Sequence, residues 1–113
     1  MSVRVLEEVR RAVSASEDAD DALRDTVREL ASEPGVAWAG IAFVEGETLA
    51  LGPSAGVPDE ERRVSVPVAY HGATVGELRV DGGLELAVLD EIAGLIAAPV
   101  LLGWDTGGEA WVP

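Results

Sequence analysis

The sequence predicts a small α/β domain of the α+β type, with helices near both ends of the chain and two β-hairpins between them. Apolar residues recur at three- and four-residue spacing near both ends, which is typical of amphipathic helices. Between these segments, short runs rich in Val and Ala are separated by Gly and Pro, as in strands joined by turns. The chain has 113 residues, 48% of them hydrophobic, which fits one domain with a packed core.

Two helices are expected before the first strand. The first carries an apolar stripe of Val5, Leu6, Val9 and Val13, and Ser14 to Asp18 interrupts it. The second ends at Pro34 and Gly35. Its apolar face is formed by Ala19, Ala22, Leu23, Val27 and Leu30.

Two β-hairpins follow the helices. Val36 to Val44 and Thr48 to Gly52 are predicted to form the first, and Arg63 to Tyr70 and Thr74 to Asp81 the second. The connection Gly52 to Arg62 is rich in Gly, Pro and charge, which indicates a surface loop.

A last helix is predicted to begin near Glu85. Its apolar stripe is Leu86, Leu89, Ile92, Ala93 and Ile96. Because proline disturbs a helix interior, Pro99 predicts an end between Ala98 and Leu102. The Gly-rich tail 103–113 is expected to be irregular, and the core is expected to span about 3–102 of one domain covering 1–113.

Charge and composition argue against several classes of partner. Eight Arg oppose 21 Asp and Glu, and the net charge of −13 repels nucleic acid and anionic membranes. There is no cysteine for a disulfide, a thiolate nucleophile or a thiolate metal site. The N-terminal segment carries charge where a signal peptide needs an apolar run, so we expect a cytoplasmic protein without cofactor or metal.

Three motifs that suggest chemistry have simpler explanations. Asp105, Thr106 and Gly107 match an aspartic-protease triplet, but the context of that triplet is missing, and a Gly-rich turn explains it better. The acidic residues of 18–29 match the first positions of a calcium-binding loop, but the later positions that need a ligand and a glycine do not fit. We therefore expect these acids to favour the start of the second helix. His71, the only histidine, is expected in a turn beside Gly72.

Three stretches of the chain resemble the GAF domain. Ala37 to Val44 looks like the first strand of that family, Val64 to Val80 like its second hairpin, and Leu89 to Ile96 like its final helix. The resemblance implies a mainly antiparallel sheet in which the second predicted strand lies beside the first, then the fourth, then the third. It also places the N- and C-terminal helices on one face of the sheet.

The resemblance implies a sensing or regulatory module that binds a small ligand or a protein partner. Ligand-binding members carry a longer segment before the third strand, whereas only Pro53 to Arg62 is available here. The family also includes enzymes that reduce free methionine sulfoxide through thiolates. Because cysteine is absent, that activity is excluded at this stage, and we expect no enzyme and no catalytic residues. Two alternatives stay open: a dimerisation or scaffold protein of the profilin- or roadblock-like kind, and a small-molecule enzyme on a GAF scaffold.

Strand alternation points to a candidate ligand-binding surface. If Ile41, Phe43, Leu78 and Val80 face the helices, Trp38, Ala42, Glu77 and Arg79 lie on the opposite face, and Ala50 is placed with them. Arg79 is the expected anchor for a small anionic ligand, with a surface ion pair to Glu77 or Asp81 as the alternative. The tail from Trp104 to Trp111 is expected to pack near this face. A homodimer is expected through the terminal helices, because a sheet already covered by two other helices would leave the apolar stripe of the first helix exposed.

Overall fold

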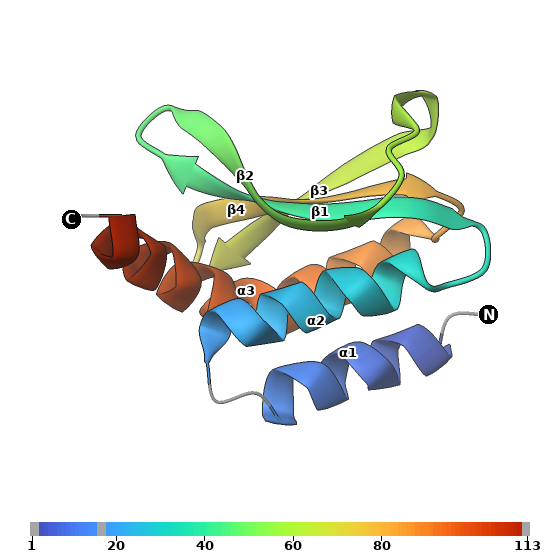
Figure 1. Cartoon of the computed structure of the whole chain (residues 1–113), viewed down its shortest axis with the longest axis horizontal. Helices are drawn as coiled ribbons and strands as arrows, with labels where there is room; N and C mark the ends of the chain where they lie inside the picture. The colour runs from blue at the N-terminus through green and yellow to red at the C-terminus, as the bar shows by residue number, and fades with distance from the viewer. Residues whose placement is uncertain (1–2, 16–17, 112–113) are drawn as a thin grey trace.

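The computed structural model describes the backbone of residues 3–15 and 18–111, and the side chains of residues 4–15 and 18–102. The chain runs through two helices, two hairpins and a last helix, as the sequence predicts (Figure 1). The elements are α1 (Val3–Ala15), α2 (Ala19–Ala31), β1 (Val36–Glu45), β2 (Thr48–Gly56), the 3₁₀ helix η1 (Glu60–Arg62), β3 (Arg63–Tyr70), β4 (Ala73–Gly82) and α3 (Leu86–Trp111).

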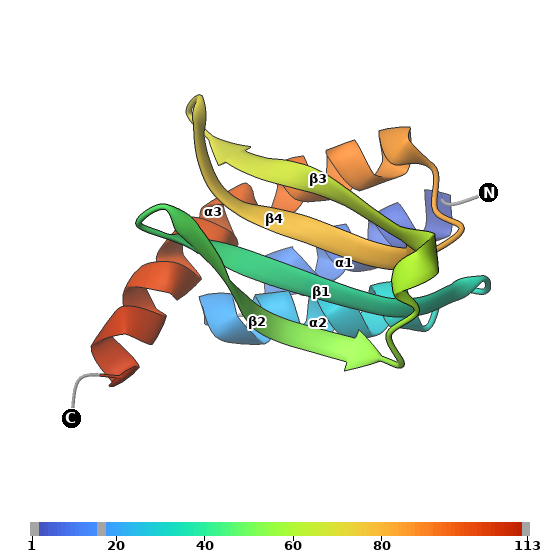
Figure 2. The ribbon, with the colours of Figure 1, turned by 90° about the horizontal axis from the view of Figure 1, so that it is seen from above.

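The four strands form one sheet in the order β2-β1-β4-β3, with every neighbouring pair antiparallel. Both the α+β class and the strand order expected from the resemblance are confirmed. The three α-helices of the described chain lie on one side of the sheet, and within residues 3–15 and 18–111 no α-helix lies over the other side (Figures 1 and 2).

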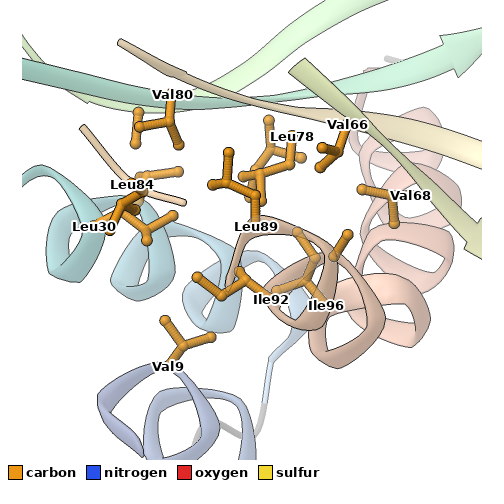
Figure 3. Close-up of a cluster of buried hydrophobic side chains, with 14 of the residues drawn as sticks. Val9, Leu30, Val66, Val68, Leu78, Val80, Leu84, Leu89, Ile92 and Ile96 are labelled. Carbon is orange, nitrogen blue, oxygen red and sulfur yellow. The ribbon is translucent and has the colours of Figure 1, made fainter. Parts of the chain in front are cut away.

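Apolar side chains fill the space between the sheet and the helices. Leu78 and Val80 point from β4 toward Leu89 and Ile92 of α3 (Figure 3). Ile41 of β1 is buried in the same cluster. These contacts hold the sheet because apolar burial is the main favourable term in folding.

The stripe on α1 belongs to this same core. Val5 and Val9 are buried within one chain, and Leu6 and Val13 pack partly against the core. The observation that motivated a homodimer, a stripe in need of a partner, is therefore explained inside the monomer, and the homodimer stays a prediction without that support.

The connection between the hairpins is shorter than the sequence predicts. β2 continues to Gly56. After a register shift between Gly40 and Ala42 of β1, the β2 strand pairs again with β1 up to that residue. Pro53 lies at this irregularity, where the missing N–H of a proline is tolerated.

The predicted end of the last helix is wrong. α3 contains Pro99 and its backbone stays helical to Trp111, projecting past the sheet (Figure 2). Ile96, Ala97 and Val100 are buried on both sides of the proline, and this packing offsets its cost of about 3 kcal/mol in a helix interior. In the described part of the chain, no helix is long and apolar enough to cross a membrane.

Truncation of a core side chain tests this packing. Leu78 is 0% exposed, so Leu78→Ala should lower the free energy of unfolding by about 2–5 kcal/mol. The matched control is Leu51→Ala, at a leucine 54% exposed, which should change it by less than about 0.5 kcal/mol. Urea denaturation followed by circular dichroism measures both, and equal losses would contradict the assignment of the core.

Candidate functional site

The face of the sheet opposite the helices, called the open face below, carries charged side chains in a regular order. On the two central strands Trp38 lies opposite Asp81, Gly40 opposite Arg79, and Ala42 opposite Glu77. On the other side of β4, the β3 residues opposite Asp81, Arg79 and Glu77 are Arg63, Ser65 and Pro67. Three cross-strand rows result, and alternation along the strands places all nine residues on the open face.

The first row contains an ion pair between a partly exposed arginine and a buried carboxylate. Arg63 donates from Nε to Oδ1 of Asp81 at 2.7 Å and from Nη2 to Oδ2 at 2.9 Å, a two-pronged contact. Oδ2 also accepts the backbone N–H of Asp59 at 2.7 Å. Asp81 is 0% exposed, so these donors replace the water that a buried carboxylate loses.

The hydrogen bonds from Arg63 hold the pKa of Asp81 below its ordinary value. The N–H of Asp59 acts in the same direction, and burial opposes both. The same contact with Asp81 raises the pKa of the Arg63 guanidinium. Both groups are therefore charged at neutral pH.

Trp38 lies beneath Arg63. The guanidinium carbon of Arg63 is 4.5 Å from the centre of the indole ring, a cation–π contact, and Trp38 is only 4% exposed. The ring extends along β1 over Gly40, where a Cβ atom would come within 2.4 Å of the ring. Because glycine at position 40 has no Cβ atom, there is room for the indole ring on the sheet.

The second and third rows hold an ion pair whose carboxylate is more accessible than Asp81. Arg79 donates from Nε to Oε1 of Glu77 at 2.6 Å, and the two side chains are 24% and 29% exposed. Among the residues whose side chains the structure describes, the terminal nitrogens of Arg79 and Oε2 of Glu77 have no hydrogen-bond partner. The pair therefore keeps donors and an acceptor free.

The structure brings the predicted site residues together with one exception. Trp38, Ala42, Glu77 and Arg79 share the open face, with Trp38 and Ala42 buried in its floor. Ala50 pairs with Phe43, which packs against the core, so the placement of Ala50 on this face was wrong. The Arg79 to Glu77 alternative is the pairing that the structure has.

Residues 103–113 bear on two earlier interpretations. The backbone of residues 103–111 is helical, so the irregular tail and the Gly-rich turn predicted at Asp105 are wrong. The side chains of Trp104 and Trp111 lie outside the described side chains, and the tail contact with Trp38 stays a prediction. The α3 backbone, however, leaves the domain on the helical side of the sheet (Figure 1).

The simpler explanations of two polar motifs are supported. Asp18 accepts the backbone N–H of Asp20 at 3.0 Å and so caps α2. His71 has φ 52° and Gly72 has φ 84°, which forms the tight turn between β3 and β4.

Sequence reasoning missed Arg63 and its pairing with Asp81, which was considered only as a partner of Arg79. Alternation along β4 already places Asp81 on the face of Trp38, and continuing β3 back to its first residue adds Arg63. The signal that could have found this pair is its position at the ends of two predicted strands, Arg63 at the start of one and Asp81 at the end of the other.

A depression on the surface lies between α2 and β2. It has a volume of about 260 Å³ and is lined by Arg24, Val27, Arg28, Pro53 and Ser54. Both arginines contact acids of their own helix, Arg24 with Asp21 and Arg28 with Asp25. Exposed pairs of this kind are common on helix surfaces, so we assign no ligand here.

The lowered pKa of Asp81 predicts how stability depends on pH. Because the pKa is lower in the folded chain than in the unfolded one, the ionised carboxylate stabilises the fold above the unfolded pKa, near 4. That stabilisation is lost as the pH falls through the lower folded pKa. Asp81→Asn should therefore be less stable than the wild type at pH 7, with a difference that narrows below about pH 4.

Urea denaturation at a series of pH values measures this difference. The control is Asp90→Asn, an exposed position on α3, where the difference from the wild type should stay small throughout. A deficit of Asp81→Asn that is independent of pH would rule out the ionised pair as its cause.

Comparisons with known proteins relate this geometry to a known fold. No family model matches the sequence, and no curated protein matches it significantly. Among solved structures, the GAF domain of a phosphoenolpyruvate-protein phosphotransferase from Coxiella burnetii has a TM-score of 0.76 and 12% identity, covering 94% of this chain and 96% of that one. The GAF domain of nlh2 from A. aeolicus, in an inactive state, has a TM-score of 0.74 and 15% identity, covering 90% and 96%.

The similar structures also include enzymes. Free methionine-R-sulfoxide reductase from Neisseria meningitidis, in complex with its substrate, has a TM-score of 0.71 and 17% identity, covering 90% of this chain and 89% of that one. The expectation that the chain is not an enzyme is therefore corrected, because close structural neighbours are enzymes and the fold leaves catalysis open. At these identities the comparisons establish the fold, and the chain has a GAF-like fold.

Proposed function

We propose that this GAF-like module is a sensing or regulatory domain that binds a small ligand on the open face, with Arg79 holding an anionic group of the ligand. The observation that carries the proposal is the position of Arg79 and the unused donors of its side chain. It lies on a central strand of a face without a helix over it, and within the described part of the chain its terminal nitrogens have no partner.

The two arginines of the open face are not equivalent. Arg63 uses both Nε and Nη2 on a buried carboxylate and also covers Trp38, so recruiting it would leave Asp81 buried and unpaired. Arg79 uses only Nε, and its planar terminal group is suited to a carboxylate or phosphate. Arg79 is therefore the better anchor.

The neighbours of the Arg79 and Glu77 pair support access by a small molecule. Its cross-strand neighbours are Gly40, Ala42, Ser65 and Pro67. These side chains are short or absent, so none of them reaches across the ion pair. The indole of Trp38, lying over Gly40, adds a rigid wall beside Arg79.

A protein partner is the second candidate for this face. Leu49 and Leu51 of β2 are 42% and 54% exposed, and their partners Val44 and Ala42 place them on the open face. Exposed apolar groups of this kind suit an interface in a dimerisation or scaffold protein. Light scattering at micromolar concentration separates the candidates, since a monomer mass argues against self-association.

Removal of the Arg79 side chain tests the ligand proposal. We expect 4-methylpentanoate, a small carboxylate, to shift the amide resonances of β1 and β4 in an NMR titration. Arg79→Ala should weaken this binding by about tenfold to a hundredfold, because a hydrogen bond to a charged group contributes about 1.5–3 kcal/mol.

The control is Arg10→Ala, at an exposed position on α1 away from the sheet. It should bind like the wild type. Equal affinity in the wild type and Arg79→Ala would remove Arg79 from the site. Native mass spectrometry of protein purified from its own host would identify any ligand that is retained.

A further inference from the structure

We infer that the ligand is a zwitterion, a small molecule whose carboxylate is held by Arg79 and whose ammonium group is held by Glu77. This inference rests on the proposed function, because it names the class of ligand for the same face.

The first argument is the set of unused polar atoms. Arg79 and Glu77 lie two residues apart on β4 and touch through Nε and Oε1, at 2.6 Å. Among the described residues, the terminal nitrogens of one and Oε2 of the other remain without a partner. The face thus presents donors and an acceptor side by side. A ligand with only an anionic group uses the donors and leaves the acceptor unmatched.

The second argument is charge. The chain has a net charge of −13, and the nearest charge to the Arg79 guanidinium is the Glu77 carboxylate. A simple anion is therefore repelled both by the protein as a whole and by a carboxylate next to its binding group. A zwitterion has no net charge, and its ammonium group turns the repulsion from Glu77 into an attraction.

The third argument is the match of the two dipoles. In an α-amino acid the carboxylate and ammonium groups are attached to one carbon, so their charges are as close as those of the contacting side chains. Placed head to tail on the Arg79 and Glu77 pair, each of the four charges has an opposite charge beside it. Hydrogen bonds between charged groups are the stronger ones, and two are formed at once.

The surroundings of the pair also indicate what the rest of the ligand is. Ala42 lies beside Glu77, and the exposed Leu51 lies beside Ala42 on β2. An apolar substituent pointing toward β2 would cover the exposed side chain of Leu51. The ligand class is therefore a small zwitterion with an aliphatic side chain.

Three probes that share the 3-methylbutyl group test the inference. They are leucine, with both charged groups, 4-methylpentanoate, without the ammonium group, and 3-methylbutylamine, without the carboxylate. Titrations followed by NMR at pH 7 and low salt should show leucine binding the wild type at least about tenfold more tightly than either other probe, since a tenfold ratio corresponds to the lower end of what one charged hydrogen bond contributes.

Glu77→Gln removes the charge that the ammonium group needs. It should bring leucine and 4-methylpentanoate to within about twofold of each other while retaining binding of the carboxylate, since Arg79 is unchanged. The control is Glu91→Gln, at an exposed position on α3, which should keep the preference for leucine. Amide spectra of each variant establish that it is folded.

The outcomes separate this inference from the function on which it rests. Two results would overturn the zwitterionic ligand: 4-methylpentanoate binding the wild type as tightly as leucine, or Glu77→Gln keeping the preference for leucine. Either result leaves the assignment of Arg79 as the anchor of an anionic group in place. If neither leucine nor 4-methylpentanoate shifts the resonances of β1 and β4, both the inference and the ligand site at Arg79 are overturned.

Discussion

Ile41, Leu78 and Val80 point from the two central strands into the layer of helices, and their burial determines the face on which every neighbouring residue of those strands lies. Successive side chains of a strand point to opposite faces, so a shift of one residue would bury Arg79 and expose Leu78. The cost of such a shift is prohibitive. The charged rows of the open face are therefore a consequence of how the core packs.

Much of this face could be predicted from alternation alone, because the hydrophobic pattern of β1 and β4 is regular. Trp38, Ala42, Glu77 and Arg79 follow directly from it. The placement of Ala50 failed because the turn of the first hairpin is shorter than expected: Glu45 pairs with Thr48, which puts Ala50 opposite Phe43. Alternation counted along one strand does not reveal which partner a residue has. Arg63 and Asp81 come together only through the pairing of β3 with β4, a contact between residues that are distant in the chain.

The last helix shows a different limit of sequence reasoning. Pro99 and the Gly-rich segment after it are local signals against a helix, and local propensity predicts an early end. The buried residues around the proline, Ile96, Ala97 and Val100, supply tertiary contacts that outweigh the local preference. These contacts depend on the position of the sheet, and that position cannot be read from the sequence of α3.

The short connection between β2 and β3 is attached to the sheet at almost every step. The N–H of Val57 binds the carbonyl of Ala37, the N–H of Asp59 binds Asp81, and Arg62 donates to the carbonyl of Gly35. Only Pro58 lies between the first two attachments, so this segment has no slack. During divergence, extra residues that would roof the open face could be accommodated here only by giving up one of these attachments. Among the described residues, the exposed turn at Gly46 and Glu47 of the first hairpin makes no such hydrogen bond to another strand, and it is the position at which this architecture can grow.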